Sequence, residues 1–109
     1  MTREQARQIA LIETKKGIVE HGIDSIAVLS PKPGKNSWTW REMLEAIIED
    51  KPLEDTDYNY IDGILNLERW IKEHNQKSYL ENEEYRPVKE GTLKVNELIE
   101  EIYSIFNKK

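Results

Sequence analysis

The chain contains no cysteine among its 109 residues. This absence excludes disulfide bonds, thiolate catalysis and zinc sites built on cysteine. Histidine is almost as scarce, because His21 and His74 are the only two in the chain. Neither stands in a spacing, such as HExxH, that would supply several metal ligands, and no serine lies in a nucleophile motif. We therefore expect no metal, no cofactor and no catalytic residue, and we predict that the protein is not an enzyme.

Long hydrophobic runs and concentrated positive charge are also missing. No apolar stretch approaches the roughly 20 residues that a membrane-spanning helix needs. Met1–Gln5 lack the apolar region of a secretion signal, so we expect a cytoplasmic protein with no membrane partner. The net charge of −5 is spread along the chain, which argues against nucleic acid as a partner.

Two short segments resemble ligand-binding loops but lack the residues that those loops require. Residues 34–37 read Gly-Lys-Asn-Ser, whereas a phosphate-binding P-loop needs Ser or Thr directly after the lysine, where Asn36 stands. Residues 55–59 match the first half of a calcium loop. Such a loop also needs a glycine and a bidentate glutamate, and this chain has Tyr60 and Asn66 at those positions. We interpret the two segments as an exposed Pro-Gly turn and as a helix-capping segment.

Apolar residues at helical spacing mark four segments, and the clearest of them opens with a start signal. Thr39 and Glu42 have the spacing of a capping box, in which each side chain bonds the backbone N–H of the other. The apolar residues that follow share one helix face; they are Trp40, Met43, Leu44 and Ile47. The sequence therefore predicts a helix from about Trp40 to Asp50.

Similar signals predict the other three helices. The first is capped by Thr2, with Gln5 at the capping-box position, and ends near His21 before Gly22. The third spans about 57–74, and its apolar stripe is predicted to face the core; the stripe comprises Tyr60, Ile64, Leu67 and Ile71. The last spans about 96–107. The predicted fold class is mainly α, a single helical domain over residues 1–109 with a bundle of about four helices.

Two of these helix signals suggest specific local features. Asn96 is the expected cap of the last helix, and the acidic linker 54–57 is expected to cap the third. Gly17 and Gly63 interrupt helical patterns. Gly17 either ends its helix or allows a close approach of another group, whereas Gly63 is expected to allow tight packing between helices.

The connections between the helices are less regular. Residues 25–30 form a short apolar run that suits either a strand or a buried extended segment. Residues 75–91 are a long polar connection without clear periodicity. A loop of this length inside a small domain is unusual, so this segment is functional, mobile or contains a short element.

The aromatic residues supply the candidate site. Core packing accounts for most large aromatics in a small domain, but exposed Trp and Tyr beside Arg are typical anchors of protein interfaces. The candidate partner surface comprises Trp38, Arg41, Tyr58 and Trp70. The leading hypothesis is a small non-enzymatic interaction factor, such as an adaptor, inhibitor or immunity-type protein of bacterial or phage style. Its acidic segments would steer a basic partner protein.

Two alternatives remain open from the sequence. Lys32, Lys35 and Arg41 lie near Trp38 and could hold a small anionic ligand in an aromatic pocket. The short helices also permit a helix-turn-helix regulator, although the acidic start of the third helix would repel phosphate. The sequence also leaves a homo-oligomer open.

Overall fold

The computed structural model describes residues 1–29, 37–54 and 56–107. Within these residues the protein is mainly α-helical, as predicted. The α-helices are α1 Arg3–His21, α2 Trp40–Glu49, α3 Tyr60–Glu73, α4 Arg86–Glu90 and α5 Val95–Asn107. The strands are β1 Ile26–Leu29 and β2 Ser37–Thr39, and two 3-10 turns are η1 Tyr79–Glu81 and η2 Glu83–Tyr85.

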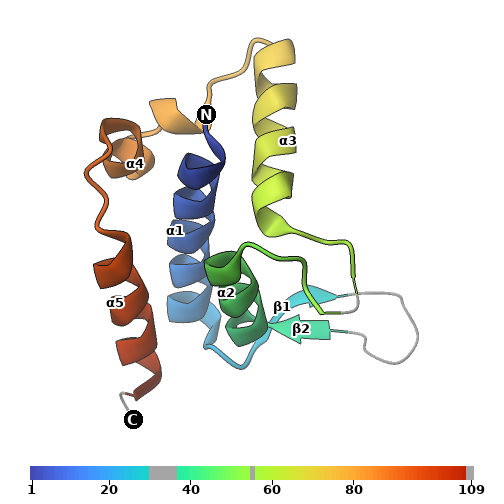
Figure 1. The fold of residues 1–109 in the computed structure, drawn as a ribbon, viewed down its shortest axis with the longest axis vertical. Coiled ribbons are helices and arrows are strands. Elements are labelled where there is room, and N and C mark those ends of the chain that lie inside the picture. The colour runs from blue at the N-terminus through green and yellow to red at the C-terminus, as the bar shows by residue number, and fades with distance from the viewer. Residues whose placement is uncertain (30–36, 55, 108–109) are drawn as a thin grey trace.

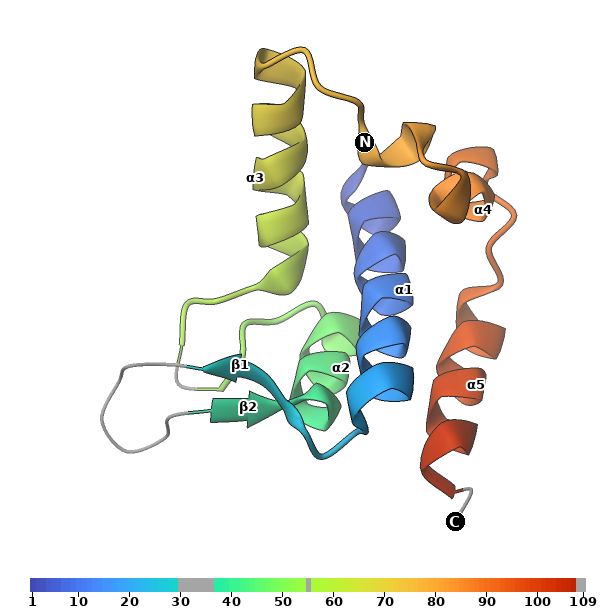
Figure 2. The ribbon, with the colours of Figure 1, turned by 180° about the vertical axis from the view of Figure 1, so that it is seen from behind.

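Helix α1 is the central element of the fold. It lies between α3 on one side and α5 on the other, and α2 packs against it as well (Figure 1 and Figure 2). Contact with several neighbours explains why its apolar stripe is wide. Its buried residues are Ala6, Ile9, Ala10, Leu11, Thr14, Gly17 and Ile18.

The clearest predicted start signals are present in the structure. Thr2 with Gln5 and Thr39 with Glu42 both form complete capping boxes, so α1 and α2 begin where the sequence places them. Thr39 also ends β2, which pairs antiparallel with β1. The apolar run near residues 25–30 is therefore a strand as far as Leu29, and the predicted Pro-Gly turn after it lies outside the described residues.

A close contact joins α1 to the start of α2. A Cβ atom added to Gly17 would lie 2.3 Å from the Trp40 indole ring, which is far inside van der Waals contact. Gly17 lies inside α1 and does not end it. Of the two explanations that the sequence offered, close approach is therefore the correct one.

Gly63 has open space around it, so the prediction that it allows tight packing between helices of this chain was wrong. It is exposed on α3, and no described atom lies within 4 Å of where its Cβ would be. No helix in the described part of the chain packs against this position. An exposed glycine inside a helix costs about 1 kcal/mol relative to alanine, so Gly63 weakens α3 without serving any contact among the described residues.

Two cap predictions were also wrong. Helix α5 begins at Val95, so Asn96 lies inside the helix. Helix α3 is capped by Asn59, whose side-chain oxygen accepts from the backbone N–H groups of Ile61 and Asp62. The acidic linker does not cap it, because Thr56 closes a separate turn with the Leu53 carbonyl.

The long connection contains short elements, which was one of the three predicted explanations. The two 3-10 turns are followed by α4, and Tyr85 and Val88 bury their side chains in the core. A side chain of α1 reaches this segment, because Lys16 forms an ion pair with Glu84. The connection is therefore packed against the central helix.

An ion-pair network joins the N-terminus of α1 to the other helices. The Arg3 guanidinium binds both carboxylate oxygens of Asp50 at 2.7 Å and one of Asp62 at 2.6 Å. Asp50 follows α2 in the left-handed conformation, and Asp62 lies in the first turn of α3. Hydrogen bonds from Arg3 lower the pKa of Asp50 below its usual range.

The Arg3 network predicts a dependence of stability on acid. Because the pKa of Asp50 is lowered by folding, its contribution is present above about pH 4 and is lost as the pH falls through the folded pKa. The groups are partly exposed, so we expect a contribution of about 1 kcal/mol or less. Urea unfolding of Arg3→Leu should show a smaller loss of stability between about pH 5 and pH 2 than the wild type. Equal losses in both proteins would contradict this account.

Gly17 and Gly63 form a matched pair for a second prediction. Alanine favours a helix over glycine by about 1 kcal/mol, so propensity alone would stabilise both variants. Gly17→Ala should instead destabilise the protein by about 1–3 kcal/mol, because its Cβ would collide with the Trp40 ring. Gly63→Ala should stabilise it by up to about 1 kcal/mol. Denaturant unfolding measures both, and a stable Gly17→Ala variant would exclude the close contact.

Candidate interaction surface

Large apolar side chains are exposed on one face of α3. Leu67 is 45% exposed and Trp70 is 50% exposed, although both lie well inside the helix. Gly63, Leu67, Trp70 and His74 follow one another at intervals of four, three and four residues, which places them on one helix face. We call these residues the α3 stripe. The buried residues of the helix, Ile61, Ile64 and Glu68, occupy a different side.

The exposed tryptophan of the stripe is held in place. The Trp70 and His74 rings stack with their centroids 4.2 Å apart and an angle of 22° between their planes. His74 Nδ1 also lies 2.9 Å from the Trp70 carbonyl oxygen. The stacking extends the flat aromatic surface to the C-terminal end of α3.

A hollow of about 220 Å³ lies beside Gly63 and Leu67. Its lining is uncharged and consists of Tyr58, Tyr60, Gly63, Ile64, Leu67 and Tyr79. Burial raises the pKa of Tyr60 to about 12, and it raises the pKa of Tyr58 and Tyr79 as well. The phenols are therefore neutral at physiological pH, and this hollow suits an apolar group.

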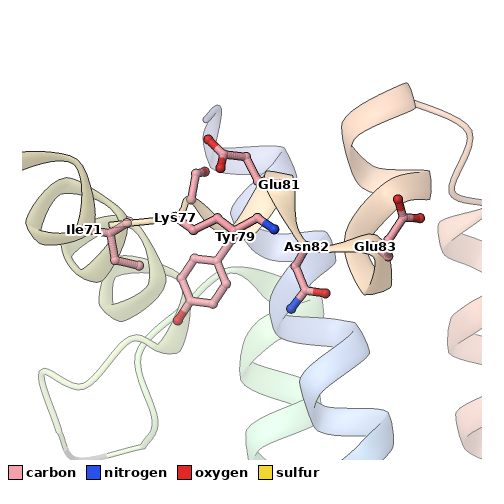
Figure 3. A pocket seen from close by; sticks show the side chains of 7 residues that line it. Ile71, Lys77, Tyr79, Glu81, Asn82 and Glu83 are labelled. Carbon is pink, nitrogen blue, oxygen red and sulfur yellow. The ribbon is translucent and has the colours of Figure 1, made fainter. Parts of the chain in front are cut away.

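A second hollow of about 640 Å³ shares one lining residue, Tyr79, with the first. Ile71 of α3 forms one wall, and residues 77–83 form the other; Figure 3 shows the Tyr79 ring between Ile71 and Asn82. The two hollows together are called the α3–η1 groove here. The α3 stripe borders this groove, because Gly63 and Leu67 line the first hollow.

A buried carboxylate fixes the second wall of the groove. Glu68 is only 4% exposed and accepts hydrogen bonds from Ser78 Oγ at 2.5 Å and from the backbone N–H of Tyr79 at 3.2 Å. Burying a carboxylate is unfavourable unless such bonds satisfy it. Glu68 therefore holds η1 at a fixed position against α3.

Acidic groups predominate around the groove. Glu81 and Glu83 line it together with one cation, Lys77. Glu13 of α1 is close enough to raise the pKa of both Tyr60 and Tyr79 by charge repulsion, although burial is the larger cause. On the outer side of α3, helical spacing places Asp62, Glu73 and Arg69 next to the stripe. In the lining of the groove the carboxylates therefore outnumber the cations, whereas on the outer side Asp62 is already paired with Arg3.

The structure separates the residues of the predicted partner surface. Tyr58 and Trp70 are both exposed; Tyr58 precedes α3 and lines the first hollow with Leu67, whereas Trp70 lies on the α3 stripe. Trp38 is 2% exposed and belongs to the core, so its assignment to the surface was wrong. Arg41 is exposed, but it binds Asp24 at 3.1 Å and lies away from α3.

The predicted anion site gains no support. Lys32 and Lys35 lie outside the described residues, and Arg41 is engaged by Asp24. Two residues of the surface, Leu67 and Gly63, do not stand out as surface residues in the sequence. Leu67 was assigned to the core because it continues the spacing of Ile64 and Ile71, and Gly63 was expected to contact another helix of this chain.

Metal sites and membrane-spanning helices were sought over residues 1–29, 37–54 and 56–107. These residues contain no group of three or more His, Asp or Glu side chains that could hold a metal ion. Among them, no helix is long and apolar enough to cross a membrane.

Comparison with known proteins adds no assignment. No protein-family model matches the chain, and no curated protein or solved structure shows significant similarity to it.

Replacing Trp38 or Trp70 by alanine should lower the free energy of unfolding by different amounts. Trp38→Ala removes a buried side chain and should lower the free energy of unfolding by about 3–5 kcal/mol. Trp70→Ala removes a half-exposed ring with one stacking contact and should cost about 1 kcal/mol or less. Urea unfolding followed by circular dichroism measures both. A large loss for Trp70→Ala would mean that this residue supports the fold.

Proposed function

We propose that the protein acts by stoichiometric binding of another protein, without catalysis, and that the α3 stripe and the α3–η1 groove form the contact surface. The observation that carries this proposal is the exposure of Leu67 and Trp70 beside Gly63, which has open space above it. Half-exposed Trp beside an apolar hollow is the kind of anchor that dominates protein interfaces.

The chemistry of the surface favours a protein over a small anion. The first hollow is uncharged, and the second has more carboxylates than cations in its lining. A small anionic ligand would meet repulsion there. A protein segment with apolar side chains would instead bury Leu67 and Trp70 and fill the hollow.

The proposal is tested by capture from a lysate of the native host with matched baits. Leu67→Ser and Val19→Ser each replace one exposed aliphatic side chain, the first on the α3 stripe and the second on α1, where Val19 is 64% exposed. We expect a protein that is retained by the wild type and by Val19→Ser but is lost from Leu67→Ser.

Circular dichroism of the three baits is the control that they are equally folded. A partner lost from both variants, or retained by both, would place binding outside the α3 stripe. The proposed function would be wrong if no protein were found that both the wild type and Val19→Ser retain and that Leu67→Ser loses.

A further inference from the structure

Resting on the proposed function, we infer that the occupant of this surface is an amphipathic helix of another protein with lysine or arginine beside its apolar face. It would cross α3 at Gly63, insert apolar side chains into the α3–η1 groove and place its basic residues against the acidic rim. Three features of the surface lead to this class of partner.

The first feature is the spacing of the α3 stripe. Gly63, Leu67 and Trp70 lie at i, i+4 and i+7, which is the pattern that one helix presents to another. A residue without a side chain at this position lets the two backbones come close. Because no described atom fills the space above Gly63, this approach is open in the free protein.

The second feature is the type of element that lines the groove. Its walls are helix α3 and the segment that contains η1, and no residue of β1 or β2 lines either hollow. Addition of a strand needs an unpaired strand edge, which these walls do not offer. An apolar groove between helical segments instead suits the apolar face of a helix.

The third feature is charge. Glu81 and Glu83 line the groove with one cation, Lys77, and Glu13 lies beside its tyrosines. Glu83 and Glu13 also form ion pairs with Arg86 and Lys16, so Glu81 is the main acidic group that faces a partner. Basic residues on a partner would be attracted to this rim. A second copy of the chain would place an acidic rim against another acidic rim, and each copy carries a net charge of −5. The charge therefore favours a different, basic protein over self-association.

The test uses a displayed library of peptides with random sequence, which can bind as helices or as extended segments, selected on the wild-type protein. We expect the enriched peptides to carry apolar residues at i, i+3 or i+4, and i+7 together with a positive net charge. Enriched peptides that are acidic or extended, and equally a failure to enrich any peptide, would overturn the inference. The lysate experiment is read separately, so a partner lost from Leu67→Ser would still support the proposed function.

Two pairs of variants place the selected peptide on the structure. Gly63→Ala should weaken its affinity by about tenfold or more, because the added methyl group fills the approach to α3. The same variant should be more stable than the wild type, so its weaker binding cannot result from misfolding. Glu81→Lys should weaken affinity and reduce its dependence on salt, whereas Glu20→Lys on α1 makes the same charge change away from the groove and should do neither.

Fluorescence anisotropy of the labelled peptide measures these effects. Unchanged affinity in Gly63→Ala, or equal effects of Glu81→Lys and Glu20→Lys, would overturn the inference. Analytical sedimentation of the protein alone tests whether a second copy of the chain covers the surface instead. A dimer that is lost in Leu67→Ser would show that a second copy covers the surface and would also overturn it.

Discussion

The contact between Trp40 and Gly17 determines how the helices assemble. The Thr39 capping box starts α2 at Trp40, and the indole ring then occupies the space beside α1 that only glycine leaves free. This contact fixes α2 along the central helix, with its far end near the N-terminus of α1. There Arg3 binds Asp50 after α2 and Asp62 at the start of α3. The position of α3, and therefore of its exposed face, follows from this sequence of contacts.

Local signals predicted the fold wherever one residue pair decided the outcome. The capping boxes of α1 and α2 need only residues three positions apart, so the sequence was sufficient to place both helix starts. The prediction failed where several side-chain oxygens could cap the same helix. Glu54, Asp57 and Asn59 all precede α3, and only the folded turn around Leu53 and Thr56 leaves Asn59 in position to cap it.

The candidate surface was only half predictable, because exposure depends on which elements pack together. Leu67 continues the helical spacing of buried Ile64, yet no element of the described chain covers it. Trp38 lies just before a helix, where the sequence suggests an exposed residue. In the structure it belongs to strand β2 and its side chain is buried in the core. The two helical glycines give the same local signal, and only the structure shows an indole ring at Gly17 and open space at Gly63.

The segment that contains η1 forms a fixed wall opposite α3. The exposed face of α3 is therefore one side of a groove and not only an uncovered helix. If the surface served only the fold, an apolar residue at position 68 could pack the junction between α3 and η1. Glu68 is a buried carboxylate instead, and it accepts from Ser78 and from the backbone of Tyr79. These directional bonds fix the distance between the two walls, which apolar packing specifies less strictly. The groove is therefore preorganised, and the helical partner proposed above would enter it without first ordering this segment.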